Sequence, residues 1–118
     1  MPDAADSRLT SRVRLYRGEE IAFGPGKADL LAAIASQGSI SAAARHMGMS
    51  YRRAWLLVDT MNRCFREPLV SSAAGGQHGG GAQLTALGAE VLARYQAALA
   101  EVEAVAGRHA GGLRDLLA

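Results

Sequence analysis

The stretch Ile40–Arg63, ISAAARHMGMSYRRAWLLVDTMNR, decides the fold of this chain. Its apolar residues recur at helical spacing in two blocks, Ala43, Ala44 and Met47, then Ala54, Leu57, Val58 and Met61. Between the blocks, Gly48 can take the positive φ of a short turn, and Ser50 can cap the helix that follows. The small side chain of Ala44 lets two helices cross closely. This spacing predicts a helix-turn-helix, in which the second helix enters the major groove of DNA.

Positive charge is concentrated on the same unit. The net charge of the whole chain is only +2, which says little about partners. Residues 45–66, however, carry Arg45, Arg52, Arg53, Arg63 and Arg66 against a single acid, Asp59. Residues 83–118 carry slightly more acidic than basic side chains. This distribution is the electrostatic footprint of a DNA-binding domain.

Length and composition indicate one globular domain in a reducing compartment. The chain has 118 residues, 49% of them apolar, and no run of the roughly 20 apolar residues that a membrane span needs. Its N-terminus lacks the apolar core of a secretory signal, so we expect a cytoplasmic protein. The single cysteine, Cys64, excludes an internal disulfide and is read as a small apolar residue on a buried helix face.

The residues before the motif predict a strand and a helix. After a loose tail over residues 1–10, Ser11–Arg17 alternates apolar and basic side chains as a half-exposed strand does. Residues 18–26 are expected to be a turn region, and Lys27–Gln37 a helix with Asp29 in its first turn. Gly38 is expected to end that helix, and Ser39 or Ser41 to cap the next one.

A glycine-rich loop lies between two short strand candidates after the motif. Residues 69–72 and 82–85 have strand character, and the nine residues between them, AAGGQHGGG, contain five glycines. Following a helix-turn-helix, this pattern predicts a β-hairpin wing whose backbone can approach a phosphate or a groove closely. The alternative is a surface loop without a partner.

The last part of the chain predicts one long helix, capped by Thr85 and running to about Gly107. Apolar or small residues follow alternating three- and four-residue steps, as in the seam of two packed helices. The residues predicted for a homodimer interface are Val91, Tyr95, Ala98, Leu99, Val102 and Val105. A helix packed wholly within its own protomer is the alternative. We thus divide the chain into a domain at 11–85, a dimerisation helix at 86–108 and a tail at 109–118, which frays or forms a short turn.

Three segments resemble the N-terminal DNA-binding domain of the ModE family of molybdate-responsive transcriptional regulators, itself similar to the LysR-type reading head. They are FGPGKADLLAAI (Phe23–Ile34), GSISAAARHMGMSYRRAW (Gly38–Trp55) and GGQHGGGAQLTALG (Gly75–Gly88). The resemblance implies a mainly α winged helix-turn-helix with a small β-hairpin. It also implies a homodimer on a palindromic operator, with recognition helices in successive major grooves and wings on flanking backbone.

Carried onto matching positions, the resemblance makes Ser50–Arg53 the start of the recognition helix and residues 77–83 the wing tip. We expect Arg52 or Arg53 to contact guanine, Ser50 and Tyr51 to bind phosphate, and Trp55 to pack between helices. The predicted DNA-binding residues are Ser39, Ser41, Arg45, Ser50, Tyr51, Arg52, Arg53, Arg63, Gln77, His78, Gly79, Gly80 and Gln83.

Full-length ModE-like regulators carry C-terminal molybdate-binding Mop domains, and we expect this chain to stop short of them. No cofactor, metal or molybdate site is therefore expected. A regulator without its own sensor could act constitutively, depend on a partner, or compete with full-length relatives for operators.

Two other classes of function are less consistent with the sequence. The three histidines, His46, His78 and His109, lie far apart, and the glycine loop lacks the Lys-Ser/Thr ending of a P-loop, so we do not expect an enzyme. A winged domain can instead bind protein, as an interaction module or as an accessory subunit of a sensor-bearing regulator. The arginine cluster favours DNA.

Overall fold

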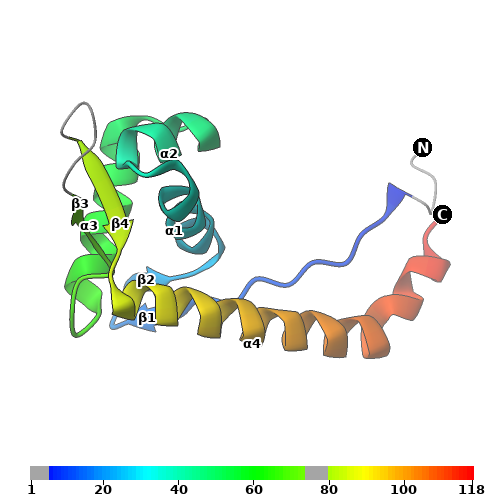
Figure 1. The fold of residues 1–118 in the computed structure, drawn as a ribbon. Helices are drawn as coiled ribbons and strands as arrows, with labels where there is room; N and C mark the ends of the chain where they lie inside the picture. The colour runs from blue at the N-terminus through cyan, green and yellow to red at the C-terminus, as the bar shows by residue number, and fades with distance from the viewer. Residues whose placement is uncertain (1–5, 74–79) are drawn as a thin grey trace.

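A computed structural model describes residues 6–73 and 80–118 of the chain. Three helices and two small antiparallel hairpins form a bundle, and a long fourth helix extends away from it (Figure 1). In chain order the elements are β1 (Leu15–Arg17), β2 (Glu20–Phe23), α1 (Pro25–Gln37), α2 (Ile40–Met47), α3 (Tyr51–Cys64), β3 (Val70–Ala73), β4 (Gly81–Leu84), α4 (Ala86–Ala110) and a 3-10 helix (Gly111–Leu116). This order confirms the predicted winged helix-turn-helix with a long C-terminal helix.

Local capping signals set the bounds of α2 and α3. The side chain of Ser39 accepts a hydrogen bond from the Ala42 amide at 3.0 Å, so Ser39, not Ser41, caps α2. Gly48 ends α2 with a φ of 69°, and Ser50 caps α3 by accepting from the Arg53 amide at 3.1 Å. Each of the two serines thus satisfies an amide that the first turn of its helix leaves without a partner.

The core forms around α1. Its Leu30, Leu31 and Ile34 are fully buried, and α2 and α3 face it with small side chains that permit close approach. The buried residues of these two helices are Ala43, Ala44, Ala54, Val58 and Met61. The predicted apolar face is thus confirmed for these five positions, while Leu57 and Met47 are half-buried.

Three expectations for the N-terminal part are wrong. The strand is shorter than Ser11–Arg17, and residues 20–23, expected within a turn region, form β2, which pairs antiparallel with β1. Helix α1 begins at Pro25, so Asp29 lies beyond the first turn, which contains no acid. Proline is tolerated at the first position of a helix, and reading Gly24-Pro25-Gly26 as a turn placed the helix start too late.

The second hairpin is the predicted wing. β3 and β4 pair antiparallel from Val70 opposite Leu84 to Ala73 opposite Gly81. The amide of Ala82 also donates to the carbonyl of Gly38 at 2.9 Å, which joins β4 to the turn between α1 and α2. The wing is therefore attached directly to the helix-turn-helix.

The N-terminal end of α4 packs against the backbone of the two residues that precede β3. Thr85 caps α4 by accepting from the Gly88 amide at 3.0 Å, and its hydroxyl donates to the Pro68 carbonyl at 2.7 Å. Gly88 is buried, and a Cβ at this position would overlap the carbonyl oxygen of Leu69. Only glycine permits this approach.

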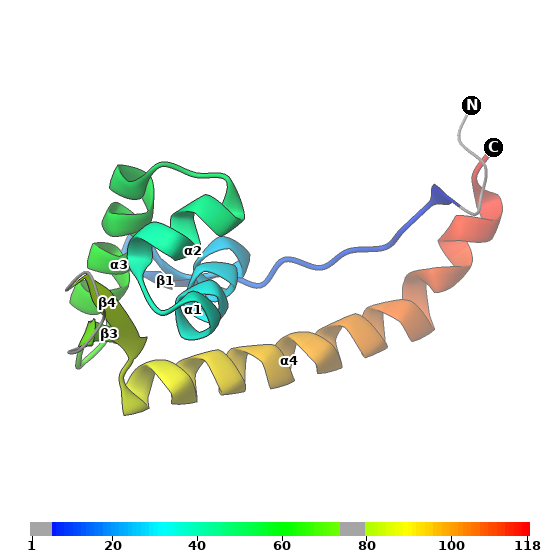
Figure 2. The same cartoon turned by 45° about the horizontal axis from the view of Figure 1, so that its top comes forward.

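Beyond its first turns, α4 leaves the bundle. Tyr95 packs edge-on against Phe23 with ring centroids 5.0 Å apart, and its hydroxyl donates to the Val13 carbonyl at 2.8 Å. Farther along, α4 projects outward in both views, and the extended residues 7–14 run out toward its far end (Figures 1 and 2). There Arg114 donates to the side chain and carbonyl of Ser7, each at 2.9 Å.

Among the residues that the structure describes, no helix is long and apolar enough to cross a membrane.

We predict that Gly88→Ala lowers the free energy of unfolding by about 1–3 kcal/mol, since the new methyl group must displace backbone. Gly107→Ala, in the open part of the same helix, is the matched control, because a Cβ there meets nothing within 4 Å. It should raise stability by up to about 1 kcal/mol through helix propensity. Urea unfolding of both variants at one protein concentration measures this, and equal effects would contradict the close contact.

Candidate nucleic-acid interface

The exposed side of α3 carries both cationic and aromatic side chains. Arg52 and Arg53 are exposed, as predicted. Trp55 is also exposed, to 47%, so the expectation that it packs between helices is wrong. The side of α3 that faces the core is already filled by Ala54, Val58 and Met61, and position 55 lies about 100° around the helix from position 54.

A groove of about 410 Å³ separates this side of α3 from the wing. Ser41 of α2 and Tyr51 and Trp55 of α3 line it, and across from them the wing contributes Ser71, Ser72, Gly80 and Gly81. The structure thereby brings together three predicted DNA-binding residues, Ser41, Tyr51 and Gly80, from three separate elements.

Arg53 faces a different hollow, of about 210 Å³, at the start of α1. Arg12, Arg14 and Lys27 line it together with Arg53, and the described residues around it include no acidic side chain. Burial lowers the pKa of Lys27, and the charge of Arg53 adds to this effect. The sequence alone did not predict that Arg12, Arg14 and Lys27 lie with Arg53 around one basic hollow. The alternation at Arg12 and Arg14 was visible, but the path of the chain that brings them to α3 was not.

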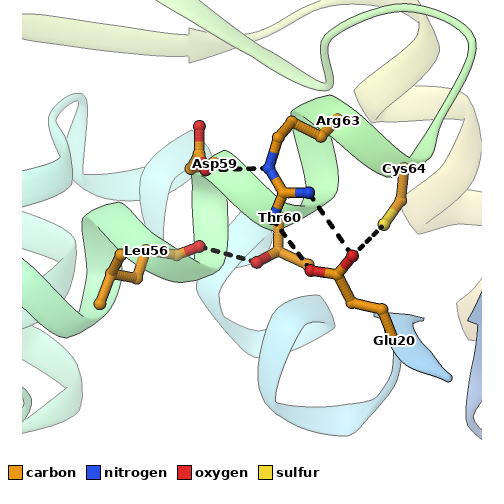
Figure 3. A network of polar contacts seen from close by, with 6 residues as sticks. All are labelled: Glu20, Leu56, Asp59, Thr60, Arg63 and Cys64. Carbon is orange, nitrogen blue, oxygen red and sulfur yellow. Dashed lines mark hydrogen bonds and ion pairs between the residues drawn. The ribbon is translucent and has the colours of Figure 1, made fainter.

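Arg63, at the other end of α3, is already paired with two carboxylates. Its guanidinium lies 2.9 Å from Glu20 and 3.0 Å from Asp59, and Figure 3 shows Glu20 of β2 between Arg63 and Cys64. The hydrogen bond from Arg63 holds the pKa of Glu20 below its ordinary value, and Glu20 in turn raises the pKa of Arg63. Cys64 is half-buried, less than expected, with its sulfur 3.8 Å from Glu20. This network joins the first hairpin to α3.

Asn62 fixes the wing to α3. Its side-chain oxygen accepts from the amides of Leu69 at 2.8 Å and Val70 at 3.2 Å, and its amide nitrogen donates to the Val70 carbonyl at 3.3 Å. The side chain of Asn62 thus bonds to both backbone groups of Val70, as a neighbouring strand would. Sequence reasoning missed this residue. The available signal was a polar amide directly after buried Met61.

The remaining predicted residues fall into three groups. Arg45, Ser50 and Gln83 are exposed, and Ser39 is half-buried. Gln77, His78 and Gly79 lie outside the described residues. Of the residues predicted for the dimer interface, Val91 and Tyr95 pack against their own protomer's core, Leu99 is half-buried, and Ala98, Val102 and Val105 are exposed.

Across residues 6–73 and 80–118, no cluster of three or more His, Cys, Asp or Glu side chains is arranged to hold a metal ion.

Residues 27–89 match the family of bacterial regulatory helix-turn-helix proteins, lysR family. The molybdenum transport protein ModE of Azotobacter vinelandii is 37% identical over 110 residues, which are 93% of this chain and 41% of that protein. The molybdenum-pterin-binding protein MopB of Rhodobacter capsulatus is 49% identical over 75 residues, 64% of this chain and 28% of MopB.

The DNA-binding transcriptional dual regulator ModE of Escherichia coli (strain K12) is 42% identical over 71 residues, 60% of this chain and 27% of that regulator. The chain spans less than half the length of these relatives. The resemblance drawn from sequence motifs is confirmed.

We predict that Asn62→Ala lowers the free energy of unfolding by about 1–3 kcal/mol, because it leaves the amides of Leu69 and Val70 without their acceptor. Gln96→Ala, which removes an amide side chain from the exposed surface of α4, is the control and should change little. Thermal unfolding compares them. Amide exchange at Leu69 and Val70, faster in Asn62→Ala than in the wild type, locates the effect, and unchanged exchange there would contradict it.

Proposed function

The chain belongs to the bacterial regulatory helix-turn-helix proteins of the lysR family, a family of DNA-binding transcriptional regulators and not a class of enzymes, and we propose that it reads its operator as a homodimer. One observation carries the proposal. The capped start of α3 exposes Arg52 and Arg53, and Asn62 of the same helix anchors the wing. A duplex can therefore meet the helix and the wing together.

We assign base reading to Arg52 and phosphate binding to Arg53. Arg53 lies with Arg12, Arg14 and Lys27 around one hollow, and such a group of cations suits the backbone, whose negative charge is independent of sequence. Arg52 is exposed outside that group and can form a bidentate contact with guanine. Ser39 and Ser50 accept cap hydrogen bonds, so their hydroxyl protons are available to phosphate.

The remaining predicted DNA-binding residues are assigned around these two arginines. Arg45 of α2 extends the phosphate-binding side, and Gln83 and Gly80 with Gln77, His78 and Gly79 would reach flanking backbone or the minor groove. Arg63 is a secondary contact in this proposal, since Glu20 and Asp59 offset its charge.

The names of the relatives connect them with molybdenum transport and molybdenum-pterin binding. We propose that the operators of this regulator lie beside genes for molybdenum uptake or use.

We propose dimerisation through the outer half of α4. The molecule measures 53 × 30 × 23 Å with a radius of gyration of 17.1 Å, against about 13.5 Å for a compact domain of this length. The excess reflects the projecting helix, on which Val102 and Val105 are 40% and 46% exposed. Ala98 and Leu99 continue this apolar row toward the bundle. A second copy would cover it and place two recognition helices on half-sites roughly 34 Å apart.

Reversing the charge at both arginines of α3 tests DNA binding. A duplex is first selected from a random library with the wild-type protein, and its affinity is then measured by fluorescence anisotropy across a salt series. Arg52→Glu with Arg53→Glu should weaken binding at least about 100-fold, since each lost contact is worth about 1–3 kcal/mol.

The control is Arg94→Glu with Arg108→Glu, which carries the same net charge but lies on α4. It should retain nearly all affinity. An unchanged affinity of the α3 variant, with its fold intact by circular dichroism, would favour a protein-interaction module.

For the dimer, Val102→Glu with Val105→Glu should give a monomer in sedimentation velocity, because two like charges would face their counterparts across the helix pair. Ala100→Glu with Ala104→Glu adds the same charge to the opposite face of α4 and should stay dimeric. A wild-type protein that sediments as a monomer would refute this part of the proposal.

A further inference from the structure

Two large aromatic side chains on the recognition helix are not used by the core. Tyr51 and Trp55 are 54% and 47% exposed and stand one helical turn apart, so they share a face of α3. By contrast, Phe65 and Tyr95 each pack edge-on against Phe23. The exposed side chain of Trp55, in the second turn of α3, is therefore available for a contact outside the protomer.

The described residues that line the groove beside Tyr51 and Trp55 are all uncharged. Its apolar lining comes from Ile40, Val58, Val70 and Ala82 in addition to the two aromatic rings. Its polar lining comes from three serines and from Asn62, whose amide is already bonded to β3. No charged residue is among the described residues that line it, although Arg52 lies next to Tyr51 on the same helix. An apolar group that enters this groove can therefore contact its aromatic and aliphatic side chains.

We propose that this groove accepts the C5-methyl group of thymine and that Trp55 determines specificity for it. The inference rests on the proposed function, since it concerns the same face of α3. In the major groove only thymine presents a methyl group, whereas the other bases present donors and acceptors alone. Trp55 follows Arg52 by three residues, a rise of about 4.5 Å along the helix. The thymine should thus lie within about one or two base pairs of the guanine that Arg52 contacts.

Replacing thymine with deoxyuridine tests the proposal. Deoxyuridine keeps the O4 acceptor and the base pairing of thymine and lacks only the methyl group. The probe is the duplex selected with the wild-type protein, with each thymine replaced in turn. We expect roughly fourfold weaker binding at one or two positions in each half-site, the loss that matches one buried methyl group.

The same series is then measured with three variants. Trp55→Ala and Trp55→Gln should bind the thymine and deoxyuridine duplexes equally at those positions, and Trp55→Gln keeps a side chain of substantial size in case Trp55→Ala folds poorly. Tyr16→Ala is the matched control, because Tyr16 is also an exposed aromatic residue, at 55%, but lies on β1 away from the groove. It should keep the full preference for thymine.

The outcomes separate this inference from the proposed function. If the wild-type protein selects no duplex, the proposed function fails and this inference fails with it. If it selects a duplex but binds every deoxyuridine duplex equally well, DNA reading stands and the methyl site is refuted. A thymine preference that persists unchanged in Trp55→Ala and Trp55→Gln also refutes the role of Trp55.

Discussion

The backbone of Leu69 connects α3, the wing and the long helix α4. Its amide donates to Asn62 of α3, and its carbonyl accepts from the amide of Thr85 at 2.9 Å. Its side chain is fully buried, and Gly88 of α4 lies directly against its carbonyl oxygen. One residue thus contacts all three elements. The relative orientation of α3, the wing and α4 therefore does not depend on long exposed side chains.

This constraint explains how a small domain presents a defined surface. The wing is held from one side by Asn62 and from the other by the bond between Ala82 and Gly38. A binding surface that is already ordered before it meets its partner loses less conformational entropy on association. The groove beside Trp55 lies between α3 and this anchored wing, whereas the basic hollow beside Arg53 lies at the start of α1.

The elements predicted from sequence were those specified by neighbouring residues. Ser39, Gly48 and Ser50 act on amides within one turn, so the helix bounds of the motif could be read directly. Trp55 could not be placed, because an aromatic residue on an amphipathic helix suits a core as well as an interface. The positions of Asn62 and Arg12 depend on residues elsewhere in the fold, and no local sequence pattern predicts such contacts.

The contacts of this chain differ widely in the length of chain that each one closes. Helix α2 has only eight residues, too few to be stable alone in water, but α1 precedes it and is available for packing as soon as α2 leaves the ribosome. The contact between Ser7 and Arg114, in contrast, closes a span of 107 residues. Closing so long a loop carries the larger entropic cost. Ser7 can therefore meet its partner only after Arg114 has been synthesised, long after the residues of the helix-turn-helix.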